Sequence, residues 1–579
     1  MELQATQISL CFLLVISTLL FSSASNSDEF VQCLTKLSKE SAPTVSKLIF
    51  TPKNSSYTAA LLYSINNLRF TRPTTPKPRV IITPTTESQV QSVIYCAKKT
   101  HLEIRIRSGG HSLEGLSYVA YVPFVVLDLR NFNKVTPHVP SATAWVGGGV
   151  TNGELYYRIS QATSDYGFPS GLWANIGVGG LISGGGYGMM RRKYGLAADQ
   201  VIDAKLIDVH GRILDRQAMG EDLFWAIRGG GGGSFGVVLA WKVNLVRVPK
   251  TVTVFRVYRS LAQNMTNIFY KWQSVAPRFP KELDIRCNGQ IFLSENSTRP
   301  DKKIMVMNFE SLYLGRVDSL LKVMLKQFPE LGLVREDCFE VSWIQAMVFF
   351  TNLPLETPPE VLLDKTTLPR FDFKGRSDFT TKPIPVKGLE GIWDFMFQLP
   401  NGTAMLQFTP FGGRMSEIAE TALPFPYRAG YLYMINLYAL TDVDEANRLQ
   451  WVRNIDAYLA PYVTSNPRSA YVNYANLWMG TNNPRGRTSY AQASKWGKRY
   501  FKNNFDRLVW IKSKVDPDNF FRHEQMPKIA AAAVLSGRAS IDDLMSVEQV
   551  LQAPAHGVLG FSYVSLFSMS QDLLLSLLV

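Results

Sequence analysis

Glycine is distributed very unevenly along this chain. Of its 41 glycines, 25 lie between Gly109 and Gly236, which is less than a quarter of the 579 residues. Three clusters stand out: RSGGH (107–111), GVGGLISGGGYG (177–188) and RGGGGGSFG (228–236). Glycine at this density destabilises regular elements unless the backbone must approach something closely. Since strand-like runs follow (VIDAKLIDV, FGVVLAWKV), we predict folded loops whose backbone N–H groups face a dinucleotide-sized, phosphate-bearing ligand.

Common phosphate and metal motifs do not account for these clusters. The run Gly177-Val-Gly-Gly-Leu-Ile lacks the third glycine of the dinucleotide fingerprint, and no Gly-Lys-Ser/Thr follows any cluster. The six histidines are scattered and no CxxC occurs. The sequence therefore argues against a P-loop protein, and we expect no metal site.

The N-terminus indicates secretion. Ile8–Phe21 is an apolar run too short for a comfortable membrane span, and small residues follow it. This pattern predicts a signal peptide over residues 1–24, although it has no basic residue near its start. The four Asn-X-Ser/Thr sequons are consistent with that route and predict glycosylation at Asn54, Asn264, Asn296 and Asn401.

Secretion also bears on the cysteines and on the charge. In an oxidising compartment we expect Cys33 to pair with Cys96, whereas Cys287 and Cys338 either pair or stay free. The net charge of +14 favours acidic partners, and outside the cell it argues against nucleic acid and for a wall polyanion. The bland alternative is that the charge keeps a secreted monomer soluble. We expect the apoplast or cell wall, with the vacuole left open.

The chain changes character near Pro249. Before it, VII, LEIRIRS and FVVLDL indicate buried strands, and 87–99 indicates a helix capped by Thr85 or Thr86. After it, KIMVMNFESLYL and GYLYMINLYAL alternate as in an antiparallel sheet flanked by helices, which predicts an α+β fold.

Strand alternation sorts the later residues by face. Met434, Asn436 and Tyr438 fall on one side of a predicted strand, with Ile435 and Leu437 on the other. A second strand is predicted to place a set of side chains on one face, namely Tyr471, Asn473 and Ala475.

Four long motifs carry a resemblance to a known family. They are RSGGHSLEGLSY, GGGYGMMRRKYGLAADQVIDAKLIDVHG, LDRQAMGEDLFWAIRGGGGGSFGVVLAWKV and DPDNFFRHEQ. The chain resembles the plant berberine bridge enzyme-like oxidoreductases, which have an FAD-binding PCMH-type domain of the vanillyl-alcohol-oxidase kind. The match is nearly collinear from Phe30 to Pro527.

The resemblance implies how the chain is divided. A two-lobed FAD domain would span 25–249, with its core at 71–249, and a substrate domain would span 250–460. A C-terminal segment, 461–528, would complete the FAD domain. Residues 529–579 have no counterpart in that family. Their apolar end is consistent with a membrane anchor, with a removed lipid-anchor tail or with an artefact of the gene model. We expect no membrane association unless this tail is a real anchor.

The resemblance also implies a covalent cofactor. His111, in RSGGH, corresponds to the histidine that bonds to the 8α-methyl of FAD. Trp173 stands where many relatives have a second, cysteinyl link, so we expect mono-covalent FAD. Leu181 replaces a histidine that supports the flavin N1–C2=O locus, and Ile176 stands at an oxygen-gating position, which suggests restricted oxygen access. Further expected FAD contacts are Arg107, Ser108, Gly109, Gly110, Ser112, Gly177, Gly179, Gly180, Ser183, Gly184, Tyr187, Gly188 and Asn519.

The catalytic residues implied are tyrosines. Tyr474, in NYANLW, corresponds to a proton acceptor, and Tyr187 would orient substrate or share the proton. Because a phenol has a pKa near ~10, a positive neighbour must lower it. Met434 and Asn436 replace the lysine and glutamine of alcohol-oxidising relatives, and we count Asn436 among the catalytic residues.

These features predict a secreted, FAD-linked oxidoreductase. It would oxidise a hydroxyl, with an oligosaccharide hemiacetal as first choice, by hydride transfer to flavin N5, and O2 or another acceptor would reoxidise FAD. The sequence leaves open a monolignol or alkaloid substrate, oxidase against dehydrogenase behaviour, and a catalytically impaired FAD-binding protein.

Overall fold

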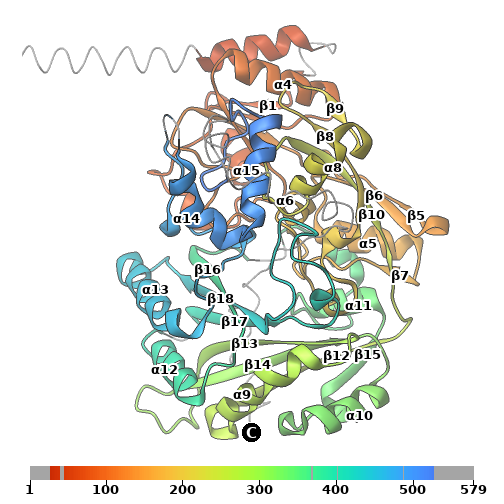
Figure 1. Ribbon diagram of the computed structural model, residues 1–579, viewed down its shortest axis with the longest axis vertical. Helices are drawn as coiled ribbons and strands as arrows, with labels where there is room; N and C mark the ends of the chain where they lie inside the picture. Colours follow the sequence, from red (N-terminus) through yellow and green to blue (C-terminus); the bar gives the residue numbers. More distant parts are fainter. Residues whose placement is uncertain are drawn as a thin grey trace, which may run out of the picture.

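The computed structural model describes residues 26–38, 45–366, 369–400, 402–484, 486 and 488–526. An upper lobe holds both the first and the last described elements, and a lower lobe is built on one long sheet (Figure 1). The predicted signal peptide, the sequon at position 401 and the tail after 526 lie outside the described residues.

The first sheet of the upper lobe has the order β1-β2-β4-β3. Strands β2 and β3 both run parallel to β4, and α4 crosses between them. Thr86 begins that helix with a capping box to Gln89, which confirms the predicted helix and its cap. The bounds are β1 Ile49–Phe50, α3 Tyr57–Leu62, β2 Val80–Ile82, α4 Glu87–Lys99, β3 Glu103–Arg107 and β4 Phe124–Asp128.

A disulfide ties the N-terminal helix, residues 26–37, to α4. It joins Cys33 to Cys96, whose Cα atoms are 5.8 Å apart, as expected from the sequence. The two remaining described cysteines are free: Cys287 is buried and Cys338 is half-buried.

The second sheet of the upper lobe is antiparallel, with the order β5-β6-β10-β8-β9. Its two long strands, β8 and β10, are the runs that follow the glycine clusters, so those strand predictions are confirmed. Strands β7 and β11 pair with each other as a separate two-stranded sheet. The bounds in this part of the chain are β5 Val135–His138, β6 Thr143–Gly147, α5 Asn152–Ala162, β7 Tyr166–Gly167, α6 Val178–Ser183, α7 Arg191–Tyr194, β8 Val201–Ile207, β9 Ile213–Leu214, α8 Arg216–Ile227, β10 Val237–Asn244 and β11 Val246–Arg247.

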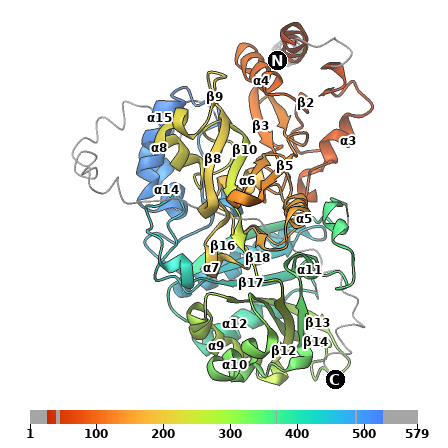
Figure 2. The ribbon, with the colours of Figure 1, turned by 90° about the vertical axis from the view of Figure 1, so that its right-hand side faces the viewer.

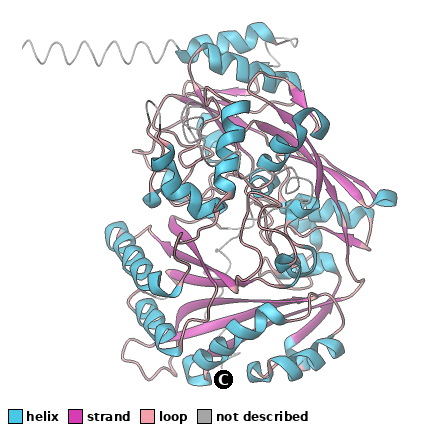
Figure 3. Ribbon diagram, viewed as in Figure 1, coloured by secondary structure: helices cyan, strands magenta, loops and turns pink. Residues whose placement is uncertain are grey.

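The lower lobe is built on a seven-stranded antiparallel sheet with the order β15-β12-β14-β13-β17-β18-β16. Helices α9, α10 and α12 lie below it, and the upper lobe faces its other side (Figures 1 and 3). The bounds are β12 Val252–Ser260, α9 Met265–Val275, β13 Leu283–Leu293, β14 Lys303–Tyr313, α10 Val317–Gln327, β15 Cys338–Val341, α11 Trp343–Phe349, β16 Phe373–Thr380, α12 Val386–Phe397, β17 Ala404–Pro410, β18 Tyr433–Leu440 and α13 Glu445–Leu459.

The two faces of β18 belong to different cores. Ile435 and Leu437 join the apolar core with the helices of the lower lobe. Met434 and Tyr438 join the core shared with the upper lobe. The predicted alternation is therefore confirmed, and it turns Asn436 toward the upper lobe.

The last helices return to the upper lobe. Helix α15 (Asn504–Val515) packs beside α8, and helix α14 (Tyr490–Phe501) packs against α15 (Figure 2). The predicted strand around Tyr471–Ala475 is wrong: Val472–Tyr474 form a short 3-10 helix. A helical turn removes strict alternation, so Tyr471 and Tyr474 lie edge to face, with ring centroids 5.1 Å apart.

The described ranges contain neither a membrane-spanning helix nor a metal-binding cluster. None of their helices has the length and apolar character needed to cross a membrane. They also bring together no group of three His, Cys, Asp or Glu side chains with the arrangement of a metal site.

Candidate active site

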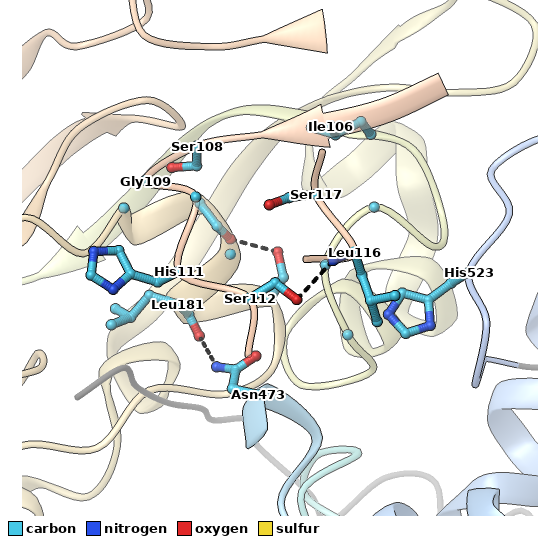
Figure 4. A pocket seen from close by; sticks show the side chains of 18 of the residues that line it. Ile106, Ser108, Gly109, His111, Ser112, Leu116, Ser117, Leu181, Asn473 and His523 are labelled. Carbon is cyan, nitrogen blue, oxygen red and sulfur yellow. Dashed lines mark hydrogen bonds between the residues drawn. The ribbon is translucent and has the colours of Figure 1, made fainter. Parts of the chain in front are cut away.

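A cavity lies where the glycine clusters meet in the upper lobe. Backbone and side chains from all three clusters line it, together with residues 472–475 and 522–523. Figure 4 shows His111, Ser117, Leu181 and His523 around this space. The predicted cofactor residues among its lining are Ser108, Gly109, Gly110, His111, Ser112, Gly177, Gly179, Gly180 and Ser183.

The first two glycine clusters touch backbone to backbone. A Cβ built on Gly109 would lie 2.2 Å from the Gly177 nitrogen, and one on Gly177 would lie 2.1 Å from the Gly109 nitrogen. Neither position has room for a side chain. Gly180 is different, because a Cβ there would meet nothing within 4 Å. The first pair brings the loops together, and Gly180 leaves open space in the cavity.

The RSGGH loop is anchored by its polar residues. Ser108 Oγ donates to the Gly148 carbonyl at 2.7 Å, and Asn66 Nδ2 donates to the Gly109 carbonyl at 2.7 Å. Gly110 adopts a φ of +68°, which favours glycine. Ser112 Oγ accepts from the Leu116 backbone N–H at 3.0 Å. These contacts fix the path of the backbone into His111.

Arg107 is held entirely within the protein. Its guanidinium is fully buried, donating from Nε to Asp128 at 2.8 Å and from its two other nitrogens to the carbonyls of Leu61 and Ala60. It is not among the residues that line the cavity. These contacts fix the start of the RSGGH loop, and the expected contact of Arg107 with FAD stays a prediction.

His111 carries a buried, neutral imidazole. Its Nε2 atom is buried and has no hydrogen-bond partner among the described residues. Burial lowers the pKa of its imidazole to about 3, so the ring is uncharged at neutral pH. A neutral imidazole with an unpaired ring nitrogen beside a glycine-lined cavity has the chemistry needed for attachment to a flavin methyl group.

Trp173, Leu181 and Ile176 are all buried apolar residues near this loop. Ile176 and Leu181 line the cavity. Trp173 lies in the same hydrophobic core as these two residues but is not among the residues that line the cavity. The Leu181 carbonyl accepts from Asn473 Nδ2 at 3.1 Å, as Figure 4 shows. Asn473 thus brings an amide to the wall where the replaced histidine was expected.

Some predicted contacts fall outside the cavity lining. Gly184 packs against the side chain of Asn473, because a Cβ built on Gly184 would lie 1.9 Å from Asn473 Oδ1. Gly188 packs in the same way against the carbonyl oxygen of Ser170. Asn519 lies in the turn after α15, where its N–H donates to the Asp516 carbonyl. None of these three is among the lining residues.

Several residues that line the cavity were not named individually as cofactor contacts in the sequence analysis. They come from the third glycine cluster and from the RHEQ run, both of which were visible as motifs: Gly231, Gly232, Gly233, Arg522 and His523. Burial lowers the pKa of His523 to about 4, so this ring is also neutral. The motifs identified these segments, but they did not predict which of their residues face the cavity.

A short hydrogen-bonded chain stands at the boundary between the cavity and the seven-stranded sheet. The hydroxyls of Tyr187 and Tyr474 are 3.0 Å apart, and Asn436 Nδ2 donates to the Tyr187 hydroxyl at 3.0 Å. All three side chains are buried, and Tyr474 also lines the cavity. The structure thus brings together the three predicted catalytic residues from three separate segments.

The electrostatics at this chain correct one expectation. Burial raises the pKa of Tyr187 to about 12, while the hydrogen bonds from Tyr474 and Asn436 oppose that rise. Burial raises the pKa of Tyr474 well above its usual value, and neighbouring tyrosines add to the effect. The nearby cation is Arg191, 5.6 Å from the Tyr187 ring centroid. The positive neighbour expected for Tyr474 therefore serves Tyr187 instead.

Comparison with known proteins agrees with this geometry. Residues 78–216 match the family model of the FAD binding domain, and residues 470–526 match that of berberine and berberine like. Berberine bridge enzyme-like 24 of Arabidopsis thaliana is 47% identical over 513 residues, covering 87% of this chain and 93% of the relative. The chain belongs to the berberine bridge enzyme-like family. It is therefore an FAD-binding oxidoreductase, and the neutral His111 and the open glycine cradle suit that cofactor.

Members of this berberine bridge enzyme-like family carry different substrate names. Tetrahydroberberine oxidase of Berberis wilsoniae is 46% identical over 517 residues, covering 88% of this chain and 96% of the relative. A grass pollen allergen, Phl p 4, is described in its wild-type structure as a glucose dehydrogenase. That structure has a TM-score of 0.80 and 39% identity, covering 86% of this chain and 98% of its own. One of its isoleucine-to-valine variants is described as a glucose oxidase.

Proposed function

We propose that this protein oxidises a neutral carbohydrate at its anomeric hydroxyl, using FAD held covalently through His111. The observation that carries the proposal is the Tyr474–Tyr187–Asn436 chain, which stands at the edge of the cavity that His111 lines. It supplies a proton acceptor where the family places flavin chemistry. FAD, when bound, would take the hydride that leaves the substrate carbon.

The protein's own residues carry out the other parts of the reaction. The glycine cradle and His111 bind the cofactor, and the buried aromatic wall excludes water. The deprotonated Tyr187 oxygen, a phenolate, accepts the hydroxyl proton of the substrate, directly or through the Tyr474 hydroxyl at 3.0 Å. Asn436 donates to that oxygen, and a hydrogen bond to the charged form favours its formation. Removing the hydroxyl proton is what allows the hydride to leave.

The seven-stranded sheet beside these hydrogen-bonded tyrosines favours a neutral substrate over an acidic one. Its polar side chains near the tyrosines are uncharged amides and hydroxyls, and its ions are already paired. The pairs on this face are Arg191 with Asp284, and Arg256 and Arg286 with Glu310. Each guanidinium group on this face contacts a carboxylate, and we base the choice of a neutral sugar on the uncharged amides and hydroxyls next to the tyrosines. The wild-type pollen relative described as a glucose dehydrogenase points to the same class of substrate.

We propose dehydrogenase behaviour, with slow reaction toward oxygen, because Ile176 lines the cavity. In the pollen relative, a variant carries substitutions at an isoleucine and at an asparagine five positions later, and it is described as a glucose oxidase. Ile176 and Leu181 have the same spacing in this chain. A larger side chain at position 176 would narrow the path for oxygen.

We also propose that the protein is secreted and glycosylated. Asn54, Asn264 and Asn296 are exposed, so each is accessible to a glycosyltransferase. The Cys33–Cys96 disulfide suits an oxidising compartment. Treatment of the plant-expressed protein with an endoglycosidase should lower its apparent mass, and an unchanged mass would contradict glycosylation.

The direct test is anaerobic flavin absorbance with a panel of substrates. Neutral and acidic oligosaccharides, a monolignol and a benzylisoquinoline would each be added to the purified protein. Bleaching by the neutral sugars is the expected result. Bleaching only by the monolignol or the alkaloid would replace the proposed substrate class, and a colourless protein would contradict the cofactor assignment.

A second candidate is a catalytically impaired FAD-binding protein. The observation in its favour is the raised pKa of both tyrosines, because a phenol that holds its proton is a weak acceptor. In that case the flavin would be present and would bleach with dithionite, yet no member of the substrate panel would reduce it.

A further inference from the structure

A buried arginine–aspartate ion pair lies beside the tyrosine that we propose as proton acceptor. Arg191 is the first residue of α7, and its guanidinium carbon is 5.6 Å from the centroid of the Tyr187 ring. Its Nη2 atom donates to Asp284 Oδ1, on β13, at 2.8 Å. The side chains of the pair are 0% and 1% exposed. A positive and a negative charge are therefore held close to a phenol and away from solvent.

Arg191 is held in place by three separate contacts. Besides the contact with Asp284, its Nε donates to the Pro410 carbonyl at 2.9 Å, and its Nη1 donates to the Gly188 carbonyl at 2.8 Å. Pro410 is the last residue of β17, and Figure 2 shows α7 close to the strands of the seven-stranded sheet. Two of the three contacts do not involve Asp284, so the guanidinium should keep its place when only the charge of Asp284 is removed.

Asp284 faces more positive charge than that of Arg191 alone. Arg192 of α7 and Arg286 of β13 also act on its carboxyl group. Burial nevertheless raises the pKa of Asp284 to about 6, so the carboxyl is ionised above that pH. Its Oδ2 atom is buried and has no hydrogen-bond partner among the described residues. Asp284 therefore binds Arg191 through one oxygen, and Asp284→Asn keeps an oxygen for that contact while it removes the charge.

The two charges act on Tyr187 in opposite directions. The charged or titratable groups around this phenol are Arg191, Tyr438, Tyr471 and Tyr474. Burial raises the pKa of Tyr187, and the positive charge of Arg191 opposes that rise. A carboxylate in contact with the guanidinium offsets part of its field at a third group, and burial leaves both charges poorly screened. Asp284 should therefore weaken the effect of Arg191.

We infer that the Arg191–Asp284 ion pair sets the acidity of the Tyr187 phenol, with Arg191 favouring the phenolate and Asp284 limiting that effect. Both are positioning residues, because they act on the reaction only through Tyr187. The inference rests on the proposed function, in which Tyr187 accepts the substrate proton. Stability alone does not require such a pair, since buried ion pairs can often be replaced by apolar residues of similar volume without loss of stability.

The direct test is a measurement of the pKa of residue 187 in the holoprotein. A monofluorinated tyrosine incorporated at this position titrates at a lower pH than tyrosine, because fluorine withdraws electrons from the ring, and fluorine NMR reports on that one phenol. Asp284→Asn should lower its pKa by about one unit, and Arg191→Met should raise it by about one unit. General damage to the packing would not shift the pKa in opposite directions in these two variants.

Two further variants keep this test decisive. Arg192→Met removes a neighbouring buried arginine whose Nε donates to the Leu283 carbonyl at 2.9 Å. It should shift the pKa of residue 187 by clearly less than Arg191→Met does. If Asp284→Asn alone does not fold, the same change is made in the Arg191→Met background, where the cation that Asp284 binds is already gone. There it should lower the pKa relative to Arg191→Met.

The rate of anaerobic flavin reduction by a neutral sugar is the second readout. Below the pKa of Tyr187, Asp284→Asn should raise this rate roughly threefold at each pH, and Arg191→Met should lower it by a similar factor. The rate changes less than the fraction of phenolate does, because a less basic phenolate is also a weaker proton acceptor.

The two readouts separate this inference from the proposed function. An unchanged pKa of residue 187 in both variants, or shifts in the same direction, would overturn the inference. The expected opposite shifts without the matching changes in rate would support the ion pair's effect on Tyr187 and contradict Tyr187 as the proton acceptor.

Discussion

The cofactor end and the substrate end of this protein are built in opposite ways. At the cofactor end, backbone meets backbone, as at Gly109 and Gly177, and Ser108 and Arg107 find their partners within the protein. At the substrate end, the sheet presents amides whose polar atoms are left unmet at Asn288 and Asn308. The comparison teaches that close backbone approach and internal hydrogen bonds hold the cofactor end together, whereas strand register places the amides of the substrate end.

The largest effect should come from the residue where the two ends meet. Tyr187→Phe removes the proposed proton acceptor, and loss of a general base lowers rates by roughly 10²–10⁴-fold. Anaerobic stopped-flow absorbance should show that loss in the rate of flavin reduction. Tyr474→Phe should cost less, because Tyr187 keeps its hydrogen bond from Asn436.

The control for this pair is Tyr471→Phe. Its hydroxyl accepts from Asn473 and from the Gly186 backbone instead of joining the Tyr187–Tyr474 pair. Flavin reduction in this variant should stay near the wild-type rate. Equal losses in all three variants would mean that the aromatic packing, and not a proton acceptor, had been damaged.

A pair of glycine variants separates frame from cavity at the cofactor end. In Gly109→Ala the new Cβ would lie 2.2 Å from the Gly177 nitrogen, so the loops must separate, and we expect a lower melting temperature and loss of most bound flavin. In Gly180→Ala the methyl group meets nothing within 4 Å. This residue lies in helix α6, where alanine is favoured over glycine by up to about 1 kcal/mol.

Gly180→Ala should therefore fold at least as stably as the wild type and still hold less flavin. Flavin absorbance per protein and the melting temperature measured on the same samples give both quantities. Full flavin content in Gly109→Ala would contradict the close approach of the two loops. A destabilised Gly180→Ala protein would contradict the open space at that position.

A smaller effect is expected from Ile176→Val. The shorter side chain should speed reoxidation of the reduced flavin by oxygen, which stopped-flow mixing with aerated buffer measures directly. The truncation should cost about 0.5–1.5 kcal/mol of stability, because Ile176 is buried. Flavin reduction under anaerobic conditions serves as the control. A reoxidation rate that does not change would remove Ile176 from any role in oxygen access.

The two ends also differ in how much of them the sequence predicts. The strands around the glycine clusters, the α4 cap and the Cys33–Cys96 disulfide follow from local patterns and from the resemblance, and the structure confirms them. The direction of the Arg107 side chain could not be predicted from the sequence, because the RSGGH motif does not indicate whether that side chain faces the cavity or the sheet.

The sequence could not predict, for a different reason, that Asn436, Gln407, Asn288 and Asn308 form one row of carboxamides across the seven-stranded sheet. Its members come from four strands, and Asn288 and Gln407 are 119 residues apart. Only the strand register aligns them, and a one-residue slip would turn each side chain to the other face. The predicted strand near Tyr474 failed because the chain bends into a short 3-10 helix there, which local alternation did not signal.

The most direct test of the account is the pH dependence of anaerobic flavin reduction by a neutral disaccharide. With burial raising the pKa of Tyr187 to about 12, the fraction of deprotonated phenol rises tenfold for each unit by which the pH increases, as long as the pH stays below that pKa. We expect a rate that rises with a slope near one in a logarithmic plot between about pH 6 and about pH 9, and that loses this slope in Tyr187→Phe. A rate that does not depend on pH, or the same slope in the Tyr187→Phe variant, would contradict proton removal by Tyr187.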